Sequence, residues 1–169
     1  MEDDPGYDIA IVRISASVES RSIADAPLQE AVKATLLRHD TQTAQISVAL
    51  VDDLRMAELN RYHLGHEGPT DVLTFDLRDD DDDRPAGQGG PAGGALEGEI
   101  VISVDTAARE ARRRGHEVDA EASLYAVHGT LHLLGYDDHR EEDAGKMHTV
   151  EDEILSSLGM GSVFQAKPL

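Results

Sequence analysis

The sequence predicts an α/β domain in which four strands alternate with helices and form a sheet that the helices cover. Three observations support this fold class. Four short segments are rich in aliphatic and β-branched residues, the stretches between them carry apolar residues at helical spacing, and 169 residues with 40% hydrophobic side chains suffice for one domain with a real core. We therefore expect a single domain over residues 1–158 and a flexible tail at 159–169.

The first two strands and helices are predicted from patterns in the N-terminal third of the chain. Residues 9–14 alternate apolar and polar side chains, and residues 45–51 form a second apolar run. Between them, Pro27 opens a helix whose apolar positions recur every three or four residues. After the second strand, Asp52 or Asp53 is placed to cap another helix.

Two further strands are predicted at residues 72–77 and 99–104. Between them, residues 78–98 form a loop by composition, because a run of aspartates is followed by repeated Gly, Pro and Ala. A solvated insertion explains this loop, and a flap over the active site is the alternative. Asp105 is positioned to cap the helix that follows the fourth strand.

The C-terminal third predicts two more helices. Asp119 is placed to cap the first of them, and Gly135 ends it. The second runs over about residues 141–158 and carries apolar side chains at helical spacing.

The composition limits both the chemistry and the compartment. The chain has no cysteine, which excludes a thiolate metal site, a disulfide and a cysteine nucleophile. The N-terminal segment MEDDPGYD is acidic and lacks an apolar targeting region, and no segment reaches the length of a membrane span. We therefore expect a cytoplasmic protein.

The segment HGTLHLLGYDDH, which begins at His128, has the pattern of a metal site. His128 and His132 are four residues apart, so on a helix their side chains point the same way. After the bend at Gly135, Asp138 or His139 can supply a third ligand. Three protein ligands leave one tetrahedral position for water, which is typical of a catalytic zinc site.

The same segment differs from the best known zinc helix. In the H-E-x-x-H motif of metallopeptidases, the Glu next to the first His is the general base. Here that position is Gly129. The longer spacing, H-x-x-x-H-x-x-G-x-x-ligand, follows the metzincin layout and places the third ligand at Asp138, with His139 one residue later. We therefore expect a metzincin-like metal helix that serves a different substrate.

Three segments together resemble the YbeY-type endoribonucleases, also described as ribosomal RNA maturation factors. They are GPTDVLTFDL, LEGEIVISVDTAAREA and HGTLHLLGYDDH, and with the helices between them the match covers most of residues 8–158. The resemblance implies a mixed sheet with the metal helix alongside. It also implies a metal-dependent endoribonuclease specific for single-stranded RNA, with one Zn²⁺ per chain. The implied roles are 16S rRNA 3′-end maturation and ribosome quality control, with the small ribosomal subunit as partner.

Two positions depart from the family pattern. The family's third ligand is a His directly after Gly-Tyr-Asp, where this chain has Asp138 followed by His139. A carboxylate is an adequate zinc ligand and is in register, so Asp138 is preferred and His139 remains its rival. Many members also carry a functional Arg five residues before the Pro-Thr pair, where this chain has Leu64. His66 is the nearest polar substitute and the candidate catalytic residue.

The formal net charge of −19 argues against an RNA substrate, because nucleic-acid affinity depends on Lys and Arg that neutralise phosphates. The charge is uneven, however, since Arg109, Arg112, Arg113 and Arg114 cluster at the end of one helix. They are favourable cations at a helix C-terminus, a local phosphate-contacting patch, or both at once. In the second interpretation Arg109, Arg112 and Arg113 are the predicted RNA contacts.

The pattern leaves mechanism and function partly open. Zinc at such a site would lower the pKa of bound water and polarise a phosphate oxygen, so that hydroxide attacks the phosphodiester in line. Attack by the substrate's own 2′-hydroxyl is the alternative. Two other functions compete with the nuclease: a metallopeptidase-like hydrolase, and a ribosome assembly factor with a structural zinc and little activity. A fourth protein ligand such as His148 would favour the assembly factor.

Overall fold

The computed structural model describes residues 6–14, 23–68, 70–78 and 95–160. Within these ranges the chain forms four strands and five helices. In chain order they are β1 (Gly6–Arg13), α1 (Asp25–Arg38), β2 (Thr43–Val51), α2 (Asp53–Leu64), β3 (Val72–Asp76), β4 (Leu96–Ser103), α3 (Val104–Arg114), α4 (Val118–Leu133) and α5 (Glu141–Ser157). Residues 79–94 of the predicted loop and 161–169 of the predicted tail lie outside the described residues, so these parts stay predictions. The loop prediction is wrong at its C-terminal end, because residues 96–98 already pair with β2 as part of β4.

The four strands form one mixed sheet in the order β1-β2-β4-β3. β1, β2 and β4 are parallel, whereas β3 runs antiparallel to β4. The predicted fold class and the mixed sheet are therefore confirmed, and each predicted strand is present with ends that differ by a few residues. Because β2 and β4 are parallel neighbours, the chain must cross over between them, and α2 and β3 lie on that crossover.

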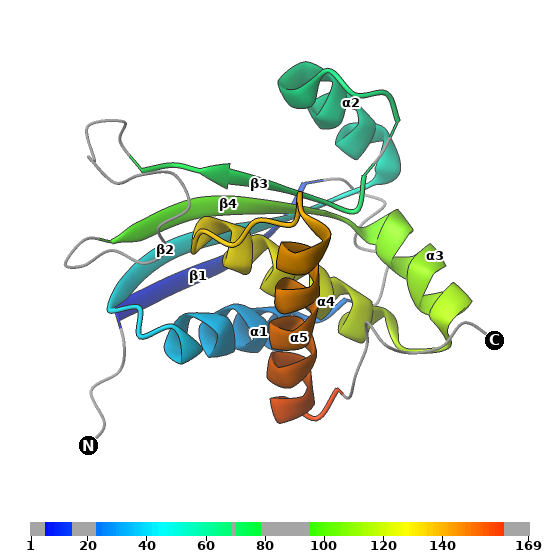
Figure 1. Cartoon of the computed structure of the whole chain (residues 1–169). Helices are drawn as coiled ribbons and strands as arrows, with labels where there is room; N and C mark the ends of the chain where they lie inside the picture. The colour runs from blue at the N-terminus through cyan, green and yellow to red at the C-terminus, as the bar shows by residue number, and fades with distance from the viewer. Residues whose placement is uncertain (1–5, 15–22, 69, 79–94, 161–169) are drawn as a thin grey trace.

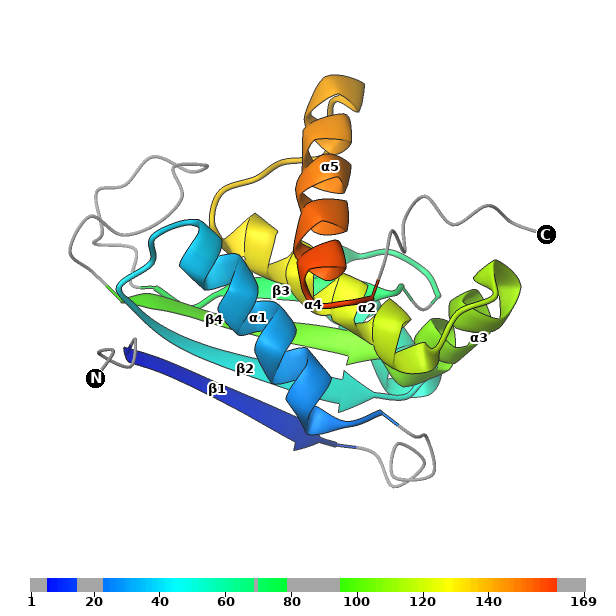
Figure 2. The ribbon, with the colours of Figure 1, turned by 90° about the horizontal axis from the view of Figure 1, so that it is seen from below.

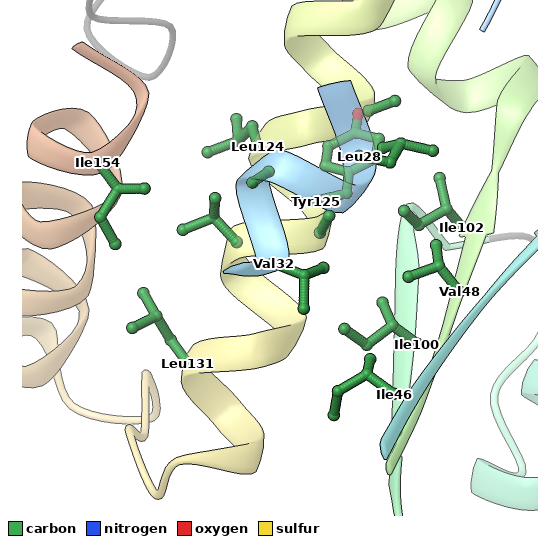
Figure 3. Packing of buried hydrophobic residues seen from close by; sticks show 14 of the residues in the cluster. Leu28, Val32, Ile46, Val48, Ile100, Ile102, Leu124, Tyr125, Leu131 and Ile154 are labelled. Carbon is green, nitrogen blue, oxygen red and sulfur yellow. The ribbon is translucent and has the colours of Figure 1, made fainter. Parts of the chain in front are cut away.

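The helices cover the two faces of the sheet unequally. α1 and α4 lie side by side on one face, and α5 packs against α4 (Figure 2). α2 lies on the opposite face (Figure 1). The larger core fills the space between α1, α4 and the sheet (Figure 3), and a smaller cluster lies under α2. Fully buried side chains of the larger core include Leu28, Val32, Ile46, Val48, Ile100, Ile102 and Leu131.

α4 is surrounded by other elements on nearly all sides. Twelve of its sixteen residues are buried, and it contacts the sheet, α1, α3 and α5. Beyond its first turn, only His128 and His132 retain exposed surface. Packing therefore holds the helix in place and gives the two imidazoles defined positions.

The first two helices begin close to the predicted positions. Asp52 is the N-cap of α2, and its carboxylate accepts a hydrogen bond from the amide of Arg55 at 2.8 Å. α1 begins at Asp25 rather than at Pro27. The proline lies inside the first turn, where a helix has no intrahelical acceptor for the amide hydrogen that proline lacks.

Two predicted caps are wrong. Ser103, not Asp105, caps α3, and Asp119 lies in the first turn of α4 rather than at its N-cap. Each acidic side chain instead binds an amide of another part of the chain. Asp105 accepts a hydrogen bond from the amide of Asp53 at 2.9 Å, and Asp119 accepts one from the amide of Ala24 at 3.1 Å. These tertiary contacts compete with local capping and replace it here.

Gly129 allows α4 to pass close to the sheet. A Cβ atom at Gly129 would lie 2.8 Å from Cγ2 of Ile100 and 3.2 Å from Oγ1 of Thr74. Both neighbours are β-branched and have few alternative rotamers, and Ile100 is fully buried. The helix could therefore accept a side chain at this position only by moving away from the sheet.

We expect Gly129→Ala to lower the free energy of unfolding by up to about 2 kcal/mol. Overpacking costs about 1–3 kcal/mol, and the better helix propensity of alanine offsets about 1 kcal/mol of it. Gly145→Ala in α5 is the matched control, because a Cβ there meets nothing within 4 Å. The control is expected to raise stability by up to about 1 kcal/mol. Chemical denaturation of both variants tests this, and effects of the same sign would contradict the packing argument.

Candidate metal centre

His128 and His132 lie one turn apart on α4 and direct their Nε2 atoms to the same point. The two Nε2 atoms are 3.0 Å apart. His128 Nδ1 lies 2.7 Å from the carboxylate of Glu151, and His132 Nδ1 lies 3.0 Å from the carbonyl oxygen of Tyr136. Both partners accept hydrogen bonds, so we assign the proton of each neutral imidazole to Nδ1. Both Nε2 lone pairs then face the same point.

Asp138 brings a carboxylate oxygen to these two nitrogens. Its Oδ2 atom lies 3.6 Å from His128 Nε2 and 3.7 Å from His132 Nε2. Ligand atoms around a tetrahedral zinc are about 3.3 Å apart, because Zn–N and Zn–O bonds are about 2.0–2.2 Å long. The observed separations lie around this value. Two lone pairs and a carboxylate at one point favour a cation, so these three side chains could hold a metal ion.

His139 does not lie in this group. Its side chain is 86% exposed, and its Nδ1 faces the carboxylate of Asp137. His139 belongs instead to a second group with Asp137 and Asp138, whose members are all exposed. The geometry therefore brings Asp138 and not His139 to the two imidazoles, while the identity of the third ligand stays a prediction.

The converging group has three members among the described residues. His148, the candidate for a fourth protein ligand, lines a neighbouring cavity with His128 but is not one of the converging side chains. This arrangement leaves the group with the ligand count of a catalytic rather than a structural zinc site.

Glu151 places a negative charge next to the Nδ1 atom of His128. Burial disfavours the protonated form of His128, but the hydrogen bond and negative charge of Glu151, helped by Asp138 and Asp71, outweigh it. The pKa of His128 is therefore raised above its ordinary value of 6.5. A carboxylate behind an imidazole also orients the ring and increases its basicity, as is typical of metal-binding histidines.

Two cavities border the metal group, defined as His128, His132 and Asp138. The larger has a volume of about 640 Å³ and is lined by β3 and by the segment that precedes it, and the smaller has a volume of about 270 Å³ and reaches the end of α3. His128 and Asp138 line both. The metal group therefore lies between two hollows, which suits an extended substrate with groups on either side of the reacting bond.

His66 and Leu64 both line the larger cavity. α2 ends at Gly65, which adopts the left-handed conformation with φ 69°. The side-chain amide of Asn60 donates a hydrogen bond to the carbonyl of Gly68 at 2.9 Å, and so holds the following segment against the helix. The fold therefore places His66 on the cavity wall, and its catalytic role stays a prediction.

The predicted RNA-contacting arginines lie away from the two cavities. Arg109 pairs with Asp53 of α2, Arg113 pairs with Glu110 at 2.6 Å, and Arg112 is exposed. Contact of these three side chains with RNA stays a prediction. The structure gives Arg109 a further role, because its ion pair joins α2 to α3.

Asp53 receives several hydrogen bonds at this junction. The hydroxyls of Ser103 and Thr106 donate to its Oδ1 at 2.6 and 2.9 Å, and Arg109 donates to its Oδ2. Partial burial opposes ionisation of Asp53, but the hydrogen bonds from Arg109 and the two hydroxyls outweigh it. The pKa of Asp53 is therefore lowered from its ordinary value of 3.8.

We expect Asp53→Asn to destabilise the protein by about 1 kcal/mol at neutral pH. Because folding lowers the pKa of Asp53, its contribution is present above the unfolded value near 3.8 and is lost as the pH falls through the folded value. The difference in unfolding free energy between wild type and variant should therefore shrink when denaturation is measured from about pH 7 down to about pH 2. A constant difference would show that the carboxylate charge is not responsible.

Arg114, which is not among the predicted RNA contacts, lines the smaller cavity together with His128. Its Nη1 atom lies 3.8 Å from the buried carboxylate of Glu121. Helical spacing could have identified Arg114 from the sequence. It lies three and seven residues after the buried Ala111 and Ala107, so it shares their inward face of α3. The inward face of α3 therefore ends in a cation beside the metal group.

A sequence model of the family described as endoribonuclease YbeY matches residues 13–159. Proteins named Endoribonuclease YbeY include one from Moorella thermoacetica, 44% identical over 117 residues, which cover 69% of this chain and 74% of the relative. Another, from Desulfitobacterium hafniense, is 42% identical over 132 residues, which cover 78% of this chain and 83% of the relative. The chain belongs to the YbeY endoribonuclease family. Membership supports an endoribonuclease role, and hence RNA as the class of substrate.

A solved structure has a similar fold. The solution structure of TM1509 from Thermotoga maritima matches with a TM-score of 0.53 and 24% sequence identity, over 95% of this chain and 97% of that one. At this identity the match supports the fold alone. None of the helices in the described part of the chain has the length and hydropathy that a membrane span requires.

Proposed function

We propose that the protein is a zinc-dependent endoribonuclease that cuts single-stranded RNA at the group formed by His128, His132 and Asp138. The proposal depends mainly on the convergence of two imidazole lone pairs and one carboxylate, whose ligand atoms are 3.0, 3.6 and 3.7 Å apart. A nitrogen and oxygen donor set with one open position suits a catalytic Zn²⁺. The family relation supplies RNA as the substrate class.

The residues of the chain contribute orientation, proton transfer and charge. His128, His132 and Asp138 would hold the zinc ion, which would supply an activated water and polarise a phosphate oxygen. Glu151 and the carbonyl of Tyr136 hold the two imidazoles in the tautomer that binds a metal. His66, on the wall of the larger cavity, exchanges a proton with the attacking or the leaving oxygen. This role is the same whether water or the 2′-hydroxyl of the substrate attacks.

Gly129 supports a nuclease over a peptidase. In H-E-x-x-H metallopeptidases the residue after the first His is the Glu that acts as general base. In this chain the corresponding Cβ position lies 2.8 Å from the side chain of Ile100 and has no room for a carboxylate. The site therefore lacks the base that H-E-x-x-H peptidases use.

We further propose, on the resemblance of the three sequence segments, that the RNA is the precursor of 16S rRNA. In this proposal the enzyme matures its 3′ end in association with the small ribosomal subunit and takes part in ribosome quality control. The predicted cytoplasmic location belongs to the same proposal.

The proposal is tested with purified protein loaded with one equivalent of Zn²⁺. The substrates are an end-labelled single-stranded RNA, the same RNA in a duplex, and a denatured protein. We expect cleavage of the single strand that a chelator abolishes and added Zn²⁺ restores, little cleavage of the duplex, and no proteolysis. No cleavage of RNA by the zinc-loaded protein would refute the proposed function, and cleavage that survives chelation would refute the metal dependence.

Arg114 supplies positive charge to a cavity that is also lined by Asp71, Asp138 and Glu151. In the proposed function its guanidinium contacts a phosphate next to the scissile bond. We expect Arg114→Met to lower kcat/KM for RNA by about 10- to 150-fold, which corresponds to losing a hydrogen bond to a charged group.

The control for this prediction is Arg38→Met. Arg38 lies on α1 and pairs with Glu153, so its replacement removes the same charge from a residue that lines neither cavity. Steady-state kinetics on both variants separates a local contact from an effect of net charge. Equal losses in the two variants would show that Arg114 does not contact the substrate.

A further inference from the structure

Three aromatic rings form a row between the end of α2 and β3. The ring centroids of Tyr62 and His63 are 4.9 Å apart with an interplanar angle of 81°. Those of His63 and Phe75 are also 4.9 Å apart, at an angle of 62°. Tyr62 is 85% exposed, and His63 is also exposed. This aromatic row, Tyr62, His63 and Phe75, therefore runs from solvent to the sheet.

The inner end of the aromatic row reaches the larger cavity beside the metal group. Phe75 lines the same cavity of about 640 Å³ as His128, His132 and Asp138. Tyr62 and His63 lie in the last turn of α2. The next residue, Leu64, ends the helix and also lines that cavity. A strand whose phosphodiester lies at the metal group would therefore meet the aromatic row on this side.

The charge on this side does not suit phosphate binding. The larger cavity is lined by Asp71, Asp76 and Asp138, of which Asp76 pairs with Arg78, and no Lys or Arg is among the described residues that line it. The whole chain has a formal net charge of −19. Carboxylates repel the RNA backbone. Nucleobases, in contrast, are uncharged, and any of the four bases can stack on an aromatic side chain. Away from the metal group itself, base stacking is therefore better suited than phosphate contacts to hold a strand on this side.

We propose that the aromatic row is a stacking platform for the unpaired bases of an RNA strand that is bound at the metal group. This inference depends on the proposed function and adds to it the way in which the substrate is held. Tyr62 offers its exposed ring to a base, His63 packs edge-on against that ring, and Phe75 packs against His63. Bases in a duplex are not available to such a platform, so it also provides a physical reason for preferring single strands.

The absence of tryptophan from the chain allows a direct test. Tyr62→Trp places a single tryptophan in the aromatic row, and its fluorescence reports stacking. Titration with a short 2′-O-methyl oligoadenylate, which provides no 2′-hydroxyl, is expected to quench this emission, while a duplex of the same sequence is not. Anisotropy of the end-labelled oligonucleotide measures binding independently. Leu54→Trp is the matched control, because Leu54 is 73% exposed but lies in the first turn of the same helix, at the opposite end from the aromatic row.

A second pair of variants measures the contribution of the ring. Tyr62→Ala is expected to weaken binding of the single strand by about 5- to 150-fold, the range for losing one stacked base, and to raise KM for its cleavage. Tyr62→Phe keeps the ring and is expected to restore binding. Because Tyr62 is exposed, neither change should affect folding.

The outcomes separate this inference from the proposed function. If the strand binds and is cleaved but the emission of the Tyr62→Trp protein does not change, or Tyr62→Ala binds like the wild type, the platform is refuted and the nuclease stands. Equal quenching in the Leu54→Trp control would also refute it, since the effect would then not be local. If the zinc-loaded wild type neither binds nor cuts RNA, both proposals fail.

Discussion

His132→Ala is expected to abolish metal binding and to lower the rate of RNA cleavage by more than about 100-fold. Loss of a residue that only orients a ligand costs roughly 10- to 100-fold in metal affinity or activity, and His132→Ala removes one of three ligands outright. His128→Ala is expected to have the same effect. Metal content of the purified variants, measured by mass spectrometry, and single-turnover cleavage of labelled RNA check both expectations.

The two histidine variants differ in their effect on the fold. The Nδ1 partner of His132 is a half-buried backbone carbonyl, whereas the partner of His128 is Glu151, which is 1% exposed. His128→Ala removes a partner from a buried carboxylate, which costs about 1–3 kcal/mol of stability. His132→Ala is therefore the cleaner test of the metal site.

Glu151→Gln provides a graded control for these variants. It retains both imidazoles and removes only the charge behind His128, so we expect zinc affinity to fall by about 10- to 100-fold rather than to vanish. A His132→Ala protein that still binds one equivalent of zinc with wild-type affinity would exclude this site.

Asp138→Ala and His139→Ala are expected to have opposite outcomes, although the two residues are adjacent. Asp138 Oδ2 lies within 3.7 Å of both imidazole nitrogens, whereas the ring of His139 is exposed and faces Asp137. We expect Asp138→Ala to lose bound zinc and to lower cleavage by more than about 100-fold, as for a histidine ligand. His139→Ala should keep its zinc and remain active.

Asp138→His is the control that separates ligand loss from a local structural effect. It introduces the residue type that the family pattern carries at this position. Imidazole is also a more common zinc ligand than carboxylate. We expect this variant to retain zinc where the alanine variant loses it. If His139→Ala empties the site and Asp138→Ala does not, the assignment of the third ligand is reversed.

The metal group was largely predictable because its first two members are close in the sequence. A spacing of four residues places His128 and His132 on one side of any helix, whatever the rest of the fold. The bend after Leu134 likewise follows from Gly135, which adopts φ 102°. Which of two adjacent side chains then faces the imidazoles depends on the path of a short turn, and sequence spacing only favoured Asp138.

Other features of the site depend on residues that are far apart in the sequence. Glu151 reaches His128 from α5, 23 residues later. Arg114 differs from its neighbours only in the face of α3 that it occupies. The acidic residues predicted as caps show the same limit, because Asp105 could be assigned to α3 by local pattern although it binds the amide of Asp53, 52 residues away.

Local sequence determined the strands, the helices and the pair of converging imidazoles, because hydrophobic periodicity and helical spacing act over a few residues. The fold alone decided how the strands pair, which carboxylate lies behind His128, and that the rings of His63 and Phe75 meet. These contacts join segments separated by many residues. They form only when α2, α4 and α5 pack around one sheet, and no local pattern encodes that arrangement.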